Sequence, residues 1–284
     1  MPIGVDRQAL LGPGTVAARV LGHPAVLLGG PRALLLQVAH PSVAAAVVAH
    51  SSFRADPYLR LARTFAVMHE ISFGSPDRSE TAAAGLAEVH RRVRGRTDAG
   101  IPYSARDPDL ALWVHATLID TALAVERRYL GELDRAGRDR LYEELTRMGP
   151  ALGVPAGMHP PDRVAFGRYM ATMEDRLLGR ELGRDSLEIA RGVLNPPPAG
   201  RLGPLGPVAA RSAARLVEAV TVDLGPALLC RAYGLPDPHR EPAARLVLGM
   251  VAGGSRLTSP RLPAVLRDPG NLVRLTDRLA RLVA

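Results

Sequence analysis

The sequence predicts an all-α protein, on three observations. Alanine, leucine and valine dominate a chain that is 47% apolar but only 4% aromatic, which favours helices packed on helices. Apolar and polar residues nowhere alternate for more than a few positions, as they would in strands. Pairs of a capping residue and proline open several stretches of helical periodicity. We expect a single helical, bundle-like domain over residues 1–284.

The first elements are short. Residues 17–28 are expected to form a helix or an irregular lead-in, followed by a turn at 29–31 whose proline suits a first helical position. Residues 32–39 then form a short apolar helix. His40-Pro41 ends it, because the residue before a proline is forced out of the helical region.

Three helices with similar start signals follow. Asp56-Pro57 opens one that runs to Gly74, and Ser75-Pro76 opens one that Gly95 ends. A polar link over residues 96–105 leads to the third, which starts at Asp107-Pro108 and is apolar on nearly all sides. It holds the chain's one tryptophan, so we expect it to be the buried central helix.

The remaining helices are expected at 133–148, 162–178, 208–224, 226–233, 241–253 and 271–283. Residues 195–207 are rich in proline and glycine. We interpret them as a surface loop rather than a domain boundary, because the helices after them are apolar enough to need the earlier ones as packing partners.

Charge and cysteine usage exclude several classes of protein. The net charge is +8 and all 36 basic residues are arginines, so lysine chemistry such as a Schiff base is excluded. The arginines are spread among acidic residues along the whole chain, which argues against nucleic-acid binding. One cysteine, Cys230, allows neither an internal disulfide nor a cysteine-based zinc site. Without a signal peptide or an apolar run of about 18 residues, we expect a cytoplasmic protein with no transmembrane segment; the oligomeric state stays open.

The candidate chemistry lies in histidines. Phosphate-loop, nucleophile-elbow and di-iron patterns are missing, whereas five of the eight histidines fall within residues 39–120. Haem iron needs one protein ligand, usually a neutral imidazole, with an apolar pocket and a few polar groups. His90 lies beside an apolar helical stripe that includes Leu86 and Val93, so we expect its imidazole to point inward and take it as the first candidate for an iron ligand.

Each candidate also has a purely structural interpretation. A lone histidine on an apolar helical face is more often a hydrogen-bonded core residue, and His115 in the central helix fits that description as well as an iron-binding one. His69 would line a pocket or make an ordinary contact between helices. Arg32 and Arg60 would pair with an anionic cofactor group or bridge helices to carboxylates.

A succession of short motifs carries a family resemblance. They are 32–41 (RALLLQVAHP), 60–64 (RLART), Val89-His90 with Gly95, and 113–118 (WVHATL). Their order and helical settings resemble the family of latex-clearing rubber oxygenases and mycophenolate-pathway (MpaB-type) oxygenases, over roughly residues 20–235.

The resemblance implies an all-helical, distantly globin-like fold with one haem b, and oxygen-dependent cleavage of a carbon–carbon double bond in an isoprenoid. His90 falls where the family places its proximal iron ligand, and Arg60 and Thr64 match its pocket arginine and threonine. Arg63 replaces a lysine that rubber oxygenases bring to the iron. Arginine is a poor iron ligand because it stays protonated, so we expect an open coordination position.

A second departure concerns the acidic base that rubber oxygenases carry before this helix, since no Asp or Glu lies between His40 and Asp56. We therefore expect a haem-dependent oxygenase or related oxidoreductase acting on a small apolar substrate, an isoprenoid or another alkene, with dioxygen or peroxide. Arg60, Arg63 and Thr64 would serve catalysis, His90 would bind iron, and His115, Arg32 and His69 would line the cofactor site. The alternative is a non-catalytic helical protein that binds haem or a lipid.

Overall fold

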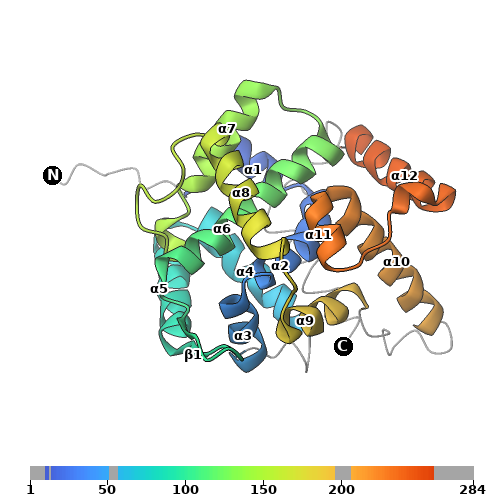
Figure 1. The fold of residues 1–284 in the computed structure, drawn as a ribbon. Coiled ribbons are helices and arrows are strands. Elements are labelled where there is room, and N and C mark those ends of the chain that lie inside the picture. Colours follow the sequence, from blue (N-terminus) through green and yellow to red (C-terminus); the bar gives the residue numbers. More distant parts are fainter. Residues whose placement is uncertain (1–9, 13, 51–56, 196–205, 259–284) are drawn as a thin grey trace.

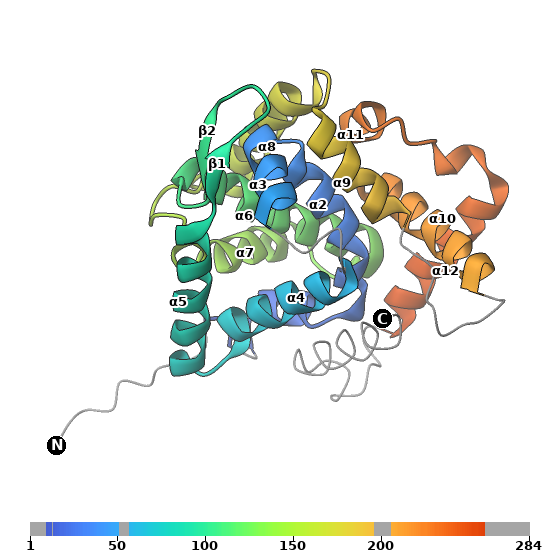
Figure 2. The same ribbon diagram turned by 90° about the horizontal axis from the view of Figure 1, so that it is seen from below.

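The structure is a computed structural model that describes residues 10–12, 14–50, 57–195 and 206–258, with every side chain in these ranges except those of 57–63 and 206–209. This part of the chain is all-α, as the composition predicts, apart from two short strands. Figure 1 shows the helices gathered around α6 (Pro108–Val125), and Figure 2 shows them from below.

The elements before α6 are α1 (Val16–Leu21), the 3-10 helix η1 (Pro24–Gly29), α2 (Gly30–Val38), α3 (Pro41–His50), α4 (Pro57–Phe73), α5 (Pro76–Arg92), β1 (Arg94–Arg96) and β2 (Pro102–Ser104). Those after it are the π-helix η3 (Glu126–Leu130), α7 (Arg135–Thr146), the 3-10 helix η4 (Pro150–Leu152), α8 (Arg163–Leu178), α9 (Arg184–Leu194), α10 (Gly206–Leu224), α11 (Ala227–Ala232), the 3-10 helix η6 (Pro238–Arg240) and α12 (Pro242–Thr258).

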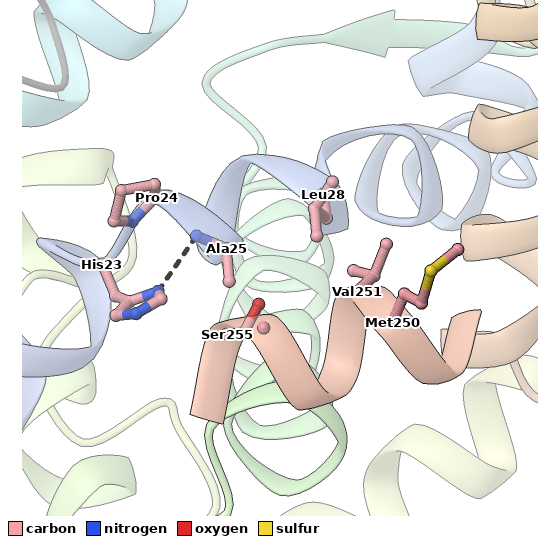
Figure 3. A pocket seen from close by; sticks show the side chains of 8 residues that line it. His23, Pro24, Ala25, Leu28, Met250, Val251 and Ser255 are labelled. Atoms are coloured by element: carbon pink, nitrogen blue, oxygen red, sulfur yellow. Dashed lines mark hydrogen bonds between the residues drawn. The ribbon is translucent and has the colours of Figure 1, made fainter. Parts of the chain in front are cut away.

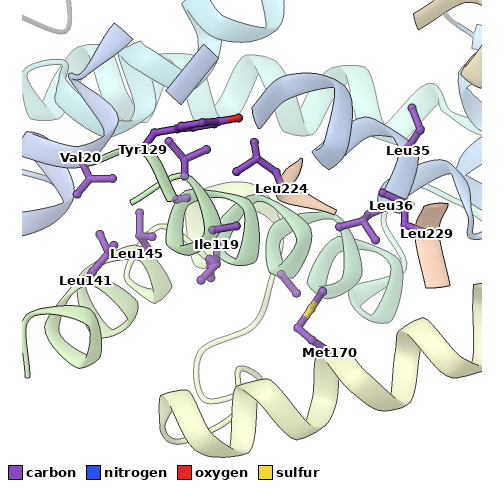
Figure 4. Close-up of a cluster of buried hydrophobic side chains, with 14 of the residues drawn as sticks. Val20, Leu35, Leu36, Ile119, Tyr129, Leu141, Leu145, Met170, Leu224 and Leu229 are labelled. Atoms are coloured by element: carbon purple, nitrogen blue, oxygen red, sulfur yellow. The ribbon is translucent and has the colours of Figure 1, made fainter. Parts of the chain in front are cut away.

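The central helix is α6, as its apolar sequence predicts. Trp113 and Ile119 are at most 1% exposed, and the Trp113 indole donates a hydrogen bond to the Gln37 carbonyl of α2 at 3.3 Å. Figure 4 shows side chains of α2, α7 and α8 converging on this helix, among them Leu36, Leu141 and Met170. Full burial of such a side chain contributes about 1.5–3 kcal/mol, so the packing around α6 is a substantial part of the stability of the fold.

Histidine–proline pairs open two of the N-terminal elements. His40-Pro41 separates α2 from α3, as predicted, and the His40 ring caps the start of α3. Its Nδ1 accepts a hydrogen bond from the Ser42 amide at 3.2 Å. His23 repeats the arrangement before Pro24, with Nδ1 accepting from the Ala25 amide at 3.1 Å at the start of η1. Each ring satisfies an amide that the first turn of a helix leaves unpaired.

The proline start signals of α4, α5 and α6 all coincide with the observed helices. The end of α5 differs from the prediction, because the helix stops at Arg92 and Val93 is extended. Residues 94–96 then pair antiparallel with 102–104, with Gly95 opposite Tyr103. The predicted irregular link is therefore a short hairpin, which packs against α3 through an edge-to-face contact between Tyr103 and His50.

The C-terminal half adds a helix that the sequence did not predict, α9, which packs on α2 and α3. The last described helix, α12, continues five residues beyond its predicted end. Most of the predicted loop at 195–207 and the predicted helix at 271–283 lie outside the described residues. Within the described ranges, no single helix has the length and apolar character to cross a membrane, although η1–α2 and α3 pass that test together as a pair bent by 110°.

Candidate functional site

Two helices carry the predicted iron ligand and the polar residues expected to oppose it. Figure 2 shows α4 and α5 meeting at one end and running apart at a steep angle. The Ser79 hydroxyl of α5 donates to the Ile71 carbonyl of α4 at 2.8 Å, and both residues are buried. Arg78 also pairs with Glu70 across this junction at 2.7 Å. The angle between the two helices is therefore held at their shared end.

On α5, His90 lies on the helix face that carries Ser79 at the junction. Residues at intervals of three or four share one face of a helix, which aligns His90 with Leu86, Ala83 and the buried Ser79. Burial decreases along this stripe, because the side chains after Ser79 are only half-buried. Val89, the residue before His90, is 58% exposed. The inward-pointing imidazole predicted from the sequence is thus half-buried, at the open end of the stripe.

The chemical state of His90 follows from this position. Among the described residues, none hydrogen-bonds its ring, and burial lowers the pKa of His90 below its usual 6.5. The imidazole is therefore neutral at neutral pH, and one of its nitrogens has a lone pair that can bind a metal ion.

Thr64 occupies the corresponding place on α4. It shares a stripe with Met68 and Ile71, which pack against or within the core, yet Thr64 itself is exposed. Burial on the core-facing stripe of α4 therefore decreases from Ile71 to Thr64, as it does on α5 from Ser79 to His90. Arg60 and Arg63 also belong to α4, but their side chains lie outside the described part of the structure.

His69 is on another side of α4, since five residues of helix place it more than a third of a turn from Thr64. Its ring is half-buried and packs against Phe73 at a centroid distance of 5.4 Å. Its Nδ1 lies 3.9 Å from Oε1 of Glu70. The structure thus places His69 among side chains near the α4–α5 junction and does not bring it to the stripe that carries Thr64.

His115 is a hydrogen-bonded core histidine. It is 3% exposed on α6, and its Nδ1 lies 2.9 Å from Nε2 of His159, in the loop before α8. Burial, followed by the repulsion of His159, lowers the pKa of His115 to about 3. Burial also lowers the pKa of His159, so the two neutral rings share one hydrogen bond.

Arg32 is buried and bridges three helices. Its guanidinium donates to the Leu224 carbonyl at 2.8 Å, to the Thr121 hydroxyl at 2.6 Å and to the Asp120 carboxylate, with which it forms an ion pair. These contacts are the interhelical bridge that the sequence left open as one interpretation. Beside them on α8, burial and the Asp120 carboxylate raise the pKa of Glu174 to about 7, against the opposing effect of Arg32.

Sequence reasoning missed three residues whose pKa the fold shifts, namely His23, His159 and Glu174. Both histidines precede proline, as His40 does, so the repeated His-Pro pair was an available signal. Glu174 carried none, because its raised pKa arises from its burial in the fold and from the Asp120 carboxylate, which is distant in sequence. Among the described residues, no cluster of three or more His, Cys, Asp or Glu side chains is placed to hold a metal ion.

Comparison with known proteins identifies the class to which this arrangement belongs. The chain matches the model of the family described as ER-bound oxygenase mpaB/B'/Rubber oxygenase, catalytic domain, over residues 18–256. The protein therefore belongs to this oxygenase family, as the motifs in its sequence predict. The match begins in α1 and reaches the last turns of α12, so it includes both α4 and α5.

Two curated relatives are similar over part of their length. An uncharacterised protein of Mycobacterium bovis and an uncharacterised protein of Mycobacterium tuberculosis are each 30% identical to this chain over 164 residues, which is 56% of the chain. The aligned region spans 63% of each relative. No solved structure matches the chain.

Proposed function

We propose that this protein is a haem-dependent oxygenase that takes a small apolar substrate, with His90 as the protein ligand of the iron. The observation that carries the proposal is the His90 imidazole, which is half-buried, neutral and without a hydrogen-bond partner among the described residues. Haem iron takes one such imidazole as its axial ligand. Membership of an oxygenase family supports the same function.

Residues of α4 and α5 would serve this cofactor. The haem, when bound, would supply the activation of dioxygen or peroxide. Thr64, which is exposed on α4, would orient the oxidant through its hydroxyl. Arg60 and Arg63 would add cationic groups on that helix, and a guanidinium pairs well with a carboxylate such as a haem propionate. Arg32 and His115 would act at a distance, since both bond to protein groups.

An apolar substrate is supported by the family description, since rubber is a hydrocarbon polymer. Cleavage of rubber itself is disfavoured, because residues 41–55 contain no carboxylate to act as a base. We therefore propose a small alkene or isoprenoid as substrate.

The test begins with the absorption spectrum of the purified full chain after expression with haem supplied. We expect a Soret band in the wild type and its loss in His90→Gly, with partial recovery when imidazole is added to that variant. The recovery separates loss of a ligand from loss of the fold, because free imidazole replaces only the ligand. A wild-type protein that takes up no haem refutes the proposal.

A matched variant decides between the two candidate ligands. His115→Asn keeps a hydrogen-bonding group near the position of Nδ1 and removes the imidazole. We expect this variant to retain haem and the Soret position of the wild type. Loss of haem from His115→Asn but not from His90→Gly would show that His115, and not His90, is the iron ligand.

A second candidate function is a non-catalytic carrier of haem or lipid, which the missing base before α4 favours. Oxygen uptake by the haem-loaded protein with terpenoid alkenes distinguishes the two functions. An oxygenase consumes oxygen in proportion to the alkene added, whereas a carrier consumes none.

A further inference from the structure

A dense run of arginines lies directly after His90. Four of the six residues 91–96 are arginines, all of them are exposed, and the run contains no acidic residue. The first two pair with the Glu88 carboxylate, at 2.7 and 2.8 Å. Arg94 and Arg96 form no salt bridge with any described acidic residue. The end of α5 and the strand β1 therefore carry an excess of positive charge at the surface.

Two of these arginines lie on the outer face of the β1–β2 hairpin. Successive side chains of a strand point to opposite faces. Tyr103 marks the inner face, because it is 7% exposed and its ring contacts His50 of α3 edge-to-face. Gly95 is paired with Tyr103, and a Cβ at this glycine would lie 2.7 Å from the tyrosine hydroxyl, so position 95 is on the inner face as well. Arg94 and Arg96 are therefore on the outer face. Figure 2 shows this hairpin at the edge of the molecule, beside α3 and the end of α5.

The composition of the outer face indicates the class of partner. Besides Arg94 and Arg96, it carries their cross-strand neighbours Ser104 and Pro102. Segments that bind a membrane surface combine basic residues with a broad apolar face, which these four residues do not form. Proteins that bind single-stranded nucleic acid add exposed aromatic rings, whereas Tyr103 is buried. The face fits the acidic surface of a protein, because guanidinium groups pair well with carboxylates.

The position of this face indicates the role of the partner, on the basis of the haem site proposed above. The Val93 amide donates to the His90 carbonyl at 3.1 Å, and one residue separates α5 from β1. Arg94 is four residues from His90, so their Cα atoms are at most about 14 Å apart. Ferric haem must be reduced before it binds dioxygen, and electron transfer slows steeply with distance. An electron donor must therefore dock close to the iron ligand.

We propose that the outer face of the β1–β2 hairpin binds the acidic surface of a small electron-transfer protein, an iron–sulfur protein, that reduces the haem held by His90. The donor is oxidised by one electron, and that electron reduces the ferric iron to ferrous iron. This proposal rests on the haem-dependent function proposed above. Complexes of electron-transfer proteins have small interfaces and depend on complementary charge, so a few arginines on one hairpin suffice for docking.

The opposite side of the molecule supplies control positions. In both Figures 1 and 2, α10 and α12 lie across the molecule from β1. Figure 3 shows the groove of about 420 Å³ between η1 and α12 on that side, where all the lining residues are uncharged or apolar. Arg211 and Arg215 are exposed on α10, which packs on both of these elements. Their replacement changes the net charge without changing the hairpin.

The test measures binding of a fluorescently labelled, acidic plant-type [2Fe–2S] ferredoxin to the full chain before haem is added. Arg94→Glu/Arg96→Glu reverses two charges on the hairpin, and Arg211→Glu/Arg215→Glu makes the same change in net charge on α10. The ionic strength is kept at about 0.1 M, where charges more than about 10 Å away are largely screened. We expect the dissociation constant to rise about tenfold or more in the hairpin variant and to stay unchanged in the α10 variant. All four side chains are exposed, so both variants should keep the wild-type circular dichroism.

The haem-loaded protein provides a second measurement. Reduced ferredoxin, at concentrations below its dissociation constant, should shift the Soret band of the hairpin variant about tenfold more slowly than that of the wild type, whereas dithionite should reduce both equally. The proposal is overturned if the wild type binds no ferredoxin or if both variants weaken its binding equally. It is also overturned if the hairpin variant loses binding to phosphatidylglycerol vesicles but not to ferredoxin. A wild type that takes up haem but binds no ferredoxin refutes this proposal alone, whereas a missing Soret band refutes the proposed function and with it the electron-transfer role.

Discussion

The His115–His159 pair makes the stability of this protein depend on pH. His115 is hydrogen-bonded to His159 and is only 3% exposed, so protonation of its ring would place a charge in the protein interior. Its pKa is lowered from 6.5 to about 3 in the folded protein. Below about pH 6.5 the unfolded chain takes up a proton that the folded protein refuses, so the free energy of unfolding falls as the pH falls.

The size of this effect follows from the two pKa values. Between about pH 7 and pH 5, the unfolded His115 becomes protonated while the folded His115 stays neutral, which removes about 2 kcal/mol from the free energy of unfolding. That is a large share of the stability of a typical domain, which is about 5–15 kcal/mol. The lowered pKa of His159 acts in the same direction.

Urea unfolding of the apoprotein at a series of pH values measures this loss. His115→Asn removes the titrating group and should lose about 2 kcal/mol less than the wild type between about pH 7 and pH 5. Leu229→Ala is the control, because it removes a fully buried core side chain and no titrating group. It should be less stable at every pH and keep the wild-type pH dependence. Equal losses in the wild type and His115→Asn would show that burial does not hold His115 neutral.

Three further predictions concern packing and charge. Gly29→Ala should cost about 1–3 kcal/mol, because its Cβ would overlap the Thr121 methyl group, whereas Gly30→Ala has open space and should be neutral or slightly stabilising by thermal unfolding. Arg32→Met should lower the free energy of unfolding by about 3 kcal/mol, because it leaves Asp120 without its partner. Adding Asp120→Asn to this variant should restore part of that loss, as measured by urea unfolding. A double variant no more stable than Arg32→Met would contradict the ion-pair explanation. Folding raises the pKa of Glu174 from its usual 4.5 to about 7, so the folded protein loses stability as the pH rises between these two values. Glu174→Gln should therefore be more stable than the wild type at about pH 8 but not at about pH 4. Equal stability of Glu174→Gln and the wild type at the higher pH would contradict this assignment.

Local signals predicted most of the helix starts. Pro57, Pro76 and Pro108 each open a helix where predicted, because a proline at the first helical position loses no hydrogen bond and already has the helical φ. The end of α5 was less predictable. Residues 94–96 pair with 102–104 as strands, so the helix ends before them. Gly95 lies in the first of these strands, close to the Tyr103 side chain, and does not end the helix.

The candidate site, too, was predictable from the sequence only in part. Motif order in the sequence identified the oxygenase family and placed His90 and Thr64 on consecutive helices, and the family match confirmed that membership. Periodicity also aligned His90 with an apolar stripe, but it did not predict that Val89 is exposed or that the stripe is open at its C-terminal end. Those properties depend on which other helices cover α5.

By itself, then, the sequence determined the helical class, the starts of the main helices and the family, because each follows from neighbouring residues or from motifs in order. Only the tertiary structure decided which polar groups are partnered. Arg32 meets Asp120 across 88 positions and His115 meets His159 across 44, while Nε2 of His23 has no hydrogen-bond partner among the described residues. Such contacts depend on how the helices pack, and local sequence patterns carry no information about residues so far apart in the chain.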